Sequence, residues 1–180
     1  MSLKRHFELM ADYNRWMNGN LYQVAAELPA QVLKENRGAY FGSILGTLNH
    51  IMVGDIIWLR RFSRHSMGLK SLEAIEALPV IISLEQILYH DFAELREARE
   101  EIDGIIVEFT RESTEKYFDA PLSYRNTRGV LSTRRFVFLV QHFFNHQTHH
   151  RGQVTTLLTQ LGLDPGVTDL LALIPEVGDE

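Results

Sequence analysis

Apolar residues recur every three or four positions along most of this chain, which is the spacing of helices that bury one face. The first such segment covers residues 2–27, with Ser2 as a helix N-cap and Pro29 just beyond the end. Asn14 and Asn18 fall on or beside its apolar face, where we expect solvent to hydrate both amides.

The same periodicity predicts three further long helices. One follows a Ser43 cap and ends near residue 62; it is apolar around most of its circumference and should be buried. The next begins at Ser83 and continues to residue 109, with the charged run ELREAREE on a solvated face. The last covers residues 134–161, after a Thr133 cap.

The connections between these segments are long. Residues 63–82 link the second and third helices and contain one short helical turn, SLEAIEAL. Residues 115–132 contain KYFDAPLSY and RGVLST, two stretches rich in β-forming residues that are joined through RNTRG. These features predict an all-α protein, a four-helix bundle with long connections and a small β-like insert before the last long helix, as a single domain over residues 1–180.

Composition narrows the classes of function. No apolar run approaches the roughly 20 residues that a membrane span needs, and charged residues interrupt the N-terminus, so we expect a cytoplasmic protein. The formal net charge of −5 argues against a nucleic-acid partner. The chain has no cysteine, so any thiol in its chemistry has to come from another molecule.

The candidate chemistry is a histidine cluster on the last helix. His142, His146, His149 and His150 share one face with Gln153, and His146 and His150 lie one helical turn apart, as do His142 and His146. His50 lies on the second helix, on a face with Gly46, Thr47, Gly54 and Ile57, where small residues admit a ligand or another backbone.

Three imidazoles from two helices would hold a divalent transition metal such as Zn, Ni or Fe and leave coordination positions open, as catalytic sites do. Two other interpretations compete with this one: His50 as a hydrogen-bonded core residue, and the cluster as a pH-responsive surface patch. The motifs HExxH and ExxH are absent, which argues against a zinc protease and a ferritin-like di-iron site.

Other polar residues have candidate roles around the site. His149 and Arg151 are candidates for catalysis, and Asn14, Gln153 and Arg151 for supporting the ligands. Asp55 needs a buried partner, for which Arg151 is the candidate. We place Arg128, Arg134 and Arg135 either on a solvated surface or at an anion-binding mouth, and the isolated His6, His65 and His90 at the surface.

Three motifs in this order resemble the DinB family of bacterial helical proteins: YNRWMN on the first helix, LNHIMVGDIIWLRR on the second and NHQTHHRGQ on the last. The resemblance covers roughly residues 9–162. It implies His50, His146 and His150 as the metal ligands, while His149 occupies a variable position. It also implies frequent homodimers, and the family includes S-transferases that use the thiols bacillithiol or mycothiol.

We therefore expect a metal-dependent enzyme that acts on small electrophiles with a low-molecular-weight thiol. The alternatives are a non-catalytic, metal-binding stress-response protein and a metal-dependent hydrolase that uses water as its nucleophile.

Overall fold

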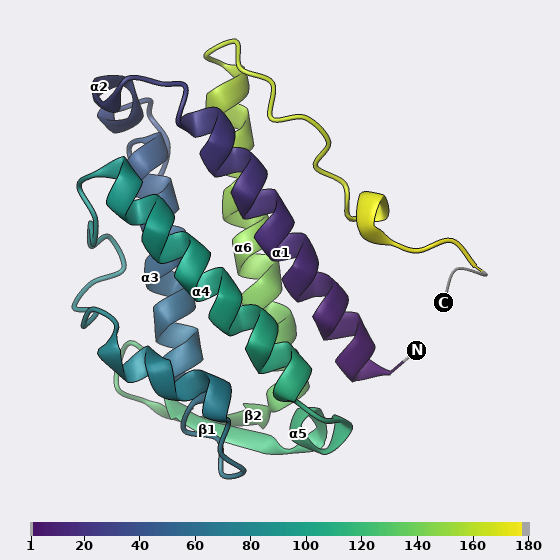
Figure 1. Cartoon of the computed structure of the whole chain (residues 1–180). Coiled ribbons are helices and arrows are strands. Elements are labelled where there is room, and N and C mark those ends of the chain that lie inside the picture. The colour runs from purple at the N-terminus through teal and green to yellow at the C-terminus, as the bar shows by residue number, and fades with distance from the viewer. Residues whose placement is uncertain (1, 178–180) are drawn as a thin grey trace.

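Four long helices lie side by side in the computed structural model, which describes residues 2–177 (Figure 1). They are α1 (Leu3–Ala25), α3 (Ile44–Phe62), α4 (Phe92–Glu112) and α6 (Phe136–Thr159). In Figure 1, α1 and α6 run upward, and α3 and α4 run downward. Helix α1 packs against α4 and α6, and α3 packs against α6 and more sparsely against α4.

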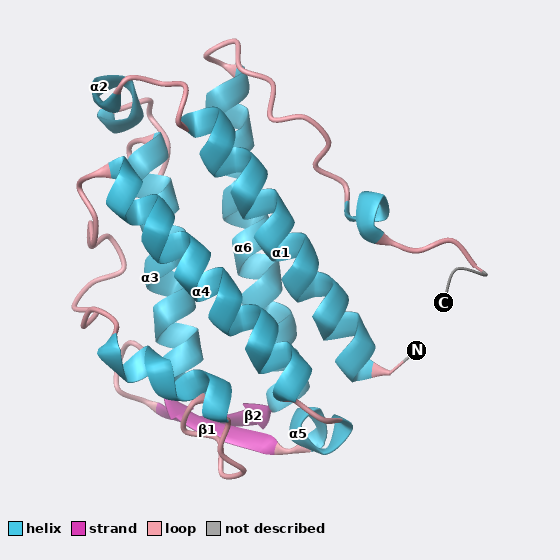
Figure 2. Ribbon diagram, in the orientation of Figure 1, coloured by secondary structure: helices cyan, strands magenta, loops and turns pink. Residues whose placement is uncertain are grey.

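Short elements occupy the connections and the C-terminal segment (Figure 2). They are α2 (Ala30–Lys34), η1 (Lys70–Ala77), α5 (Glu115–Asp119), β1 (Pro121–Arg125), β2 (Leu131–Arg135) and η2 (Leu170–Leu173). Strands β1 and β2 form an antiparallel hairpin with Pro121 opposite Arg135, directly before α6. The structure therefore confirms a mostly helical chain with a small β insert before the last long helix, although the predicted β-former KYFD is part of α5.

The helix caps match the prediction at two of the four long helices. The hydroxyl of Ser2 accepts from the Arg5 amide at 3.2 Å, and that of Ser43 accepts from the Gly46 amide at 3.0 Å. Thr133 is not a helix cap, because it lies in β2 and its hydroxyl bonds that of Ser123 at 2.7 Å. The last helix consequently starts at Phe136, and the predicted start at Arg134 was too early.

The third long helix begins nine positions later than predicted, at Phe92 rather than at Ser83. The backbone amides of Leu88 and Tyr89 donate to the side chain of Asn49 on α3, at 2.8 and 2.9 Å, rather than to a preceding helical turn. Asp91 then caps α4 by accepting from two backbone amides of its first turn.

The core combines aliphatic and aromatic side chains and is shared by all four long helices. Its largest fully buried side chains include Phe7, Phe62, Phe109, Phe118, Phe136, Phe143 and Phe144. His65, predicted at the surface, is only 4% exposed and packs its ring on Tyr117 and Phe136. His6 is half-buried and His90 is exposed.

A buried polar network crosses the centre of this core. Arg99 of α4 bonds Asp55 of α3 at 2.5 Å and Asp103 at 3.0 Å. Asn14 and Asn18 of α1 each donate to Asp103 at 2.9 Å. Burial raises the pKa of Asp103 to about 6, against the opposing effect of Arg99.

The network corrects three predictions. Asn14 and Asn18 are not hydrated at an edge, since they are 0% and 2% exposed. Arg99 belongs to the charged run that was predicted to be solvated, yet it is 2% exposed. Asp55 pairs with Arg99 rather than with Arg151.

No helix in residues 2–177 has the length and apolar character needed to cross a membrane.

Candidate metal centre

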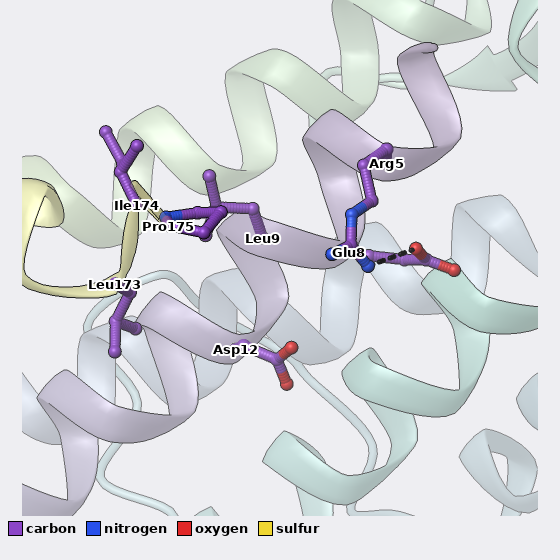
Figure 3. A pocket seen from close by; sticks show the side chains of 7 residues that line it. All are labelled: Arg5, Glu8, Leu9, Asp12, Leu173, Ile174 and Pro175. Carbon is purple, nitrogen blue, oxygen red and sulfur yellow. Dashed lines mark ion pairs between the residues drawn. The ribbon is translucent and has the colours of Figure 1, made fainter. Parts of the chain in front are cut away.

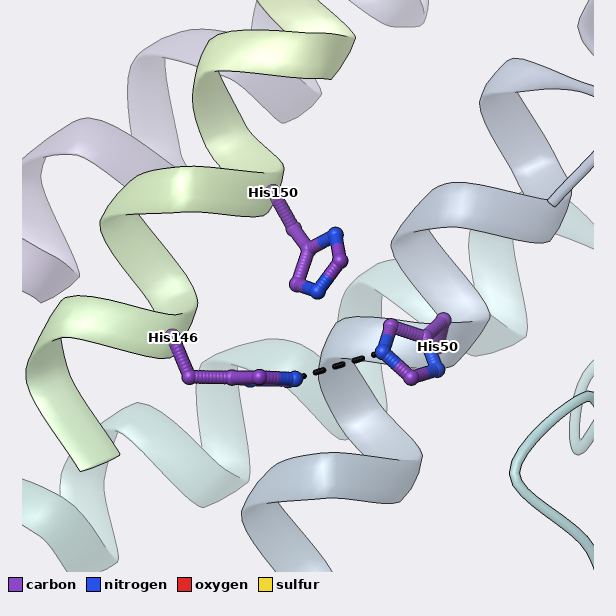
Figure 4. A group of neighbouring side chains, drawn as sticks. All are labelled: His50, His146 and His150. Carbon is purple, nitrogen blue, oxygen red and sulfur yellow. Dashed lines mark hydrogen bonds between the residues drawn. The ribbon is translucent and has the colours of Figure 1, made fainter. Parts of the chain in front are cut away.

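Gly54 makes room for a histidine ring between α3 and α6. A Cβ atom at this position would lie 2.6 Å from Cε1 and 3.2 Å from Nδ1 of His146, closer than non-bonded atoms approach. One turn earlier on the same face is His50, whose Nε2 lies 3.2 Å from Nε2 of His146 (Figure 4). The predicted small-residue face of α3 therefore allows an α6 imidazole to reach His50.

Gly46 plays the same part for a backbone segment. The carbonyl oxygen of Phe41 occupies the space where a Cβ of Gly46 would lie. This close approach brings the Phe41 ring parallel to the His50 ring, with centroids 3.7 Å apart, and edge-on to His150 at 5.5 Å. Phe41 thus covers one side of the histidines with apolar surface.

Carbonyl oxygens fix the tautomers of two of the three histidines. His50 donates from Nδ1 to the Leu84 backbone carbonyl at 2.9 Å, and His150 donates from Nδ1 to Oε1 of Gln153 at 2.8 Å. Each ring then has an unprotonated Nε2, and that of His50 faces His146, which is the arrangement usual for metal-binding imidazoles. The sequence singled out Gln153 for this supporting role.

The geometry of the three rings is compatible with one metal ion. One nitrogen each of His50, His146 and His150 lies within 4.8 Å of the other two, in a group that could hold an ion. Nitrogens about 2.0–2.1 Å from a tetrahedral ion lie about 3.3 Å apart, close to the observed separation of His50 and His146. The residues present therefore fit a three-nitrogen site for one ion.

The site favours neutral imidazoles. Burial, followed by the neighbouring rings of His150 and His50, lowers the pKa of His146 to about 3. Burial also lowers the pKa of His50 and of His150. The three rings are therefore electrically neutral at neutral pH, with one nitrogen of each able to bind a metal.

An open pocket of about 430 Å³, which we call the histidine pocket, leads to the three rings. Its wall also contains Tyr40, Phe41, Leu84, Glu85, His149 and Gln153. His149 is exposed, and its Nε2 lies 3.5 Å from Nε2 of Gln153. One candidate catalytic residue therefore lies beside the histidines.

Arg151, the other candidate, is turned away from this pocket. It is 3% exposed, donates to Oδ1 of Asn14 and lies over the ring of Tyr13 at 5.4 Å. Asn14 in turn belongs to the buried network and does not contact a histidine ligand. Both residues hold α1 against α6.

His142 stays outside the group despite its one-turn spacing from His146. Its ring packs edge-on against Trp58 at 5.1 Å and lies 6.2 Å from that of His146. Arg134 and Arg135 lie on the exposed strand β2, and Arg128 in the turn before it, none of them lining the histidine pocket.

Sequence reasoning missed two contributors to the site. Gln147 lies between two of the histidines in the chain and donates to Asp55, the neighbour of Gly54, at 2.8 Å; this bond fixes α3 against α6 at the level of the site. The spacing of Gln147 from His146 and His150 puts it on another face of the helix. The only sequence signal for it is that the buried Asp55 needs hydrogen-bond partners. The Leu84 carbonyl carried no sequence signal.

A second hollow, of about 360 Å³, lies between α1 and the C-terminal segment (Figure 3). It is lined by Arg5, Glu8, Leu9, Asp12, Leu173, Ile174 and Pro175. Arg5 and Glu8 pair with each other across 3.8 Å, and the hollow contains no histidine. The histidine pocket is therefore the better candidate for chemistry.

Comparison with protein families matches residues 1–176 to the DinB family. The chain belongs to the DinB family. It is 25% identical over 158 residues to Protein DinB of Bacillus subtilis (strain 168), a match that covers 88% of this chain and 87% of the relative. No solved structure gave a significant match. DinB membership and the three-histidine group thus agree with the resemblance seen in the sequence motifs.

Proposed function

We propose that this member of the DinB family binds one divalent transition metal, Zn, Ni or Fe, through His50, His146 and His150. The observation that carries the proposal is the convergence of three neutral imidazoles, two of them oriented by carbonyl acceptors, beside an open pocket. Three protein ligands leave at least one coordination position for a small molecule, as in catalytic rather than structural sites.

We further propose that the site is that of an S-transferase that uses a low-molecular-weight thiol and a small electrophile. A bound divalent ion would lower the pKa of a coordinated thiol, so that the sulfur becomes a nucleophile at neutral pH. We assign to His149, which lies in the wall of the pocket, the role of accepting the thiol proton on an imidazole nitrogen. The sulfur then bonds the electrophilic carbon while the leaving group departs with its electron pair.

The protein's own residues would prepare this reaction. Leu84 and Gln153 hold the imidazoles in one tautomer, and Phe41 shields one side of His50 from water. Because the chain has no cysteine, the sulfur comes from a separate molecule that enters the pocket. A metal-dependent hydrolase, with water in place of the thiol, is the second candidate, and the same open pocket supports it.

The third candidate is a non-catalytic stress-response protein in which the ion only stabilises the fold. The open pocket beside the histidines disfavours it.

We also propose that the four long helices form a four-helix bundle, which their shared core supports. A homodimer is consistent with the large exposed side chains of Val130, Leu131 and Phe138, and light scattering of the purified protein tests it.

The test of the metal site is elemental analysis of purified protein and of three variants, His50→Ala, His146→Ala and His150→Ala. Wild type should contain about one ion per chain and each variant should lose most of it. His90→Ala, which removes an exposed histidine, is the matched control and should keep the ion. Full occupancy in all three variants would show that the ligand assignment is wrong.

The test of the reaction is consumption of a small electrophile by the metal-loaded protein with and without added thiol. Thiol-dependent turnover that disappears with His146→Ala supports the transferase. Turnover that needs the ion but no thiol supports the hydrolase, and turnover that survives metal removal excludes both.

A further inference from the structure

The face of α3 that carries His50 continues for three more turns toward the hairpin. Gly54, Ile57 and Arg61 follow His50 at intervals of four, three and four residues, so all four lie on one side of the helix. The distance along the axis from His50 to Arg61 is roughly 16 Å at 1.5 Å per residue. Helical side chains lean toward the N-terminus, which brings the Arg61 guanidinium back toward the histidines.

Arg61 is a half-buried cation without a charged partner. Its guanidinium carbon lies 4.5 Å from the ring centre of Trp58 and 4.9 Å from that of Tyr124, and both aromatic rings hold it in place. Among the residues that the structure describes, no carboxylate lies within ion-pairing distance of it. A guanidinium with free N–H groups that aromatic rings have already ordered is well prepared for a planar anion.

Arg61 lines a hollow of about 420 Å³, which we call the arginine pocket. Its other contributors include Ile57, Ile81, Ile82 and the hydroxyl-bearing Thr127. Leu84 and Glu85 line both the arginine pocket and the histidine pocket, so the two hollows are neighbours along α3.

Residues 81–85, which we call the strap, line the arginine pocket, and the last two of them also line the histidine pocket. Arg60 of α3 anchors the chain just before it, by donating to the carbonyls of Leu78 and Pro79 at 2.6 and 3.0 Å. The side chain of Gln86 accepts from the Ile82 amide at 2.8 Å and donates to the Val80 carbonyl at 3.3 Å. The strap is therefore held in position by side chains of α3 and of its own segment.

We propose that the arginine pocket binds the carboxylate end of an elongated small-molecule thiol whose sulfur reaches the three histidines. This inference rests on the proposed function of the histidine site. One guanidinium with a hydroxyl in the same pocket matches a singly charged carboxylate, whereas a phosphate dianion would call for a second cation. The isoleucines provide apolar walls for a hydrocarbon stem, and Glu85 disfavours negative charge between the two ends.

Calorimetric titration of the zinc-loaded, full-length protein tests this inference. The probes are 8-mercaptooctanoate and 8-mercaptooctanol, which share a stem and differ in the terminal charge, with 3-mercaptopropionate as an acid too short to reach both pockets. The wild type should bind the long acid about 10- to 100-fold more tightly than the alcohol, from charge-assisted hydrogen bonds. The short acid should show no dependence on Arg61.

Three variants complete the experiment. Arg61→Gln should abolish the preference for the long acid while keeping the zinc content of the wild type. Arg61→Lys, which retains the charge but not the planar fork, should keep part of the preference, and it carries the test if the glutamine variant folds poorly. Arg64→Gln removes an exposed charge one turn away and should change nothing.

Each contrary result is distinguishable. Equal binding of long acid and alcohol, unchanged by Arg61→Gln, overturns the arginine pocket and leaves the thiol site intact. If neither thiol binds, but octanoate binds and its binding depends on Arg61, the carboxylate site is supported and the proposed thiol function is wrong. Tighter binding of 8-mercaptooctyl phosphate than of the carboxylate overturns the proposed ligand class.

Discussion

Gly54 is the residue that most directly sets the position of a candidate ligand, since its missing side chain is what admits the His146 ring. Gly54→Ala should displace that ring and weaken metal binding by about 10- to 100-fold, the range usual for residues that orient ligands. Two opposing effects act on the unfolding free energy of the metal-free variant. Alanine favours the helix by about 0.5–1 kcal/mol, and moving the His146 ring costs strain, so any loss of stability should not exceed that strain. Competition with a chelator and thermal unfolding measure the two effects.

Gly104→Ala on α4 is the matched control, because a Cβ there meets no atom within 4 Å. It should gain the same helical preference and leave metal affinity unchanged. Equal metal affinity in the Gly54 and Gly104 variants would contradict the role given to Gly54.

Individual residues differ in how far their roles could be predicted from the sequence. His146, His150 and Gln153 could be grouped because they repeat at helical spacing on one helix. His50 lies on another helix and joined them as a polar residue of a buried helix and through the resemblance to the DinB family; the structure brings the three histidines together. The Leu84 carbonyl could not, because every residue has a backbone carbonyl and its position depends on the path of an irregular segment. Arg99 resembled its solvated neighbours, and only the packing of α4 against α3 and α1 buries it.

The end of the irregular segment before α4 is held by the side chain of Asn49 on α3. Asn49 accepts from the amides of Leu88 and Tyr89 and donates to the carbonyls of Leu45 and Tyr89, at 2.8–3.1 Å. Asn49→Ala should destabilise the protein by about 2–3 kcal/mol, because it leaves partly buried backbone groups without partners. Denaturant unfolding measures this loss.

The same variant should speed hydrogen exchange at the amides of Leu88 and Tyr89. Asn145→Ala, at an exposed position of α6, is the control and should leave both quantities unchanged. Unchanged exchange at the two amides would show that the segment does not depend on Asn49.

Whole elements were easier to predict than their ends. The apolar repeat places all four long helices, because burial of one face is a property of the local sequence. The start of α4 was misplaced because Ser83 and Gln86 form a plausible local cap, whereas the deciding partner, Asn49, is distant in sequence. A local cap and a distant side chain compete for the same stretch of backbone, and the spacing of apolar residues gives no information about the distant one.

Across the whole molecule, the buried network ties α1, α3, α4 and α6 together through groups of opposite charge. Arg99→Ala leaves Asp55 and Asp103 without their cation and should cost about 3–5 kcal/mol of unfolding free energy. Arg96→Ala, one turn earlier, breaks only an exposed pair with Glu100 and should cost less than about 1 kcal/mol.

Urea unfolding of the two arginine variants gives the comparison directly, since both lose the same side chain from the same helix. A similar loss in both would mean that the network adds nothing beyond an ordinary surface ion pair. The expected difference would instead show that α4, which contributes no histidine ligand, stabilises the packing of α3 and α6, which do.

Leu84 links the orientation of a metal ligand to the entry of a molecule into the histidine pocket. Its carbonyl orients the His50 ring, and its side chain is part of the wall that an incoming molecule has to pass. A bulky molecule that pushes this segment outward would also stretch the bond to Nδ1 and reduce the basicity of the opposite ring nitrogen. Widening the entrance by mutation would therefore alter how strongly the protein holds its ion, even with every ligand intact.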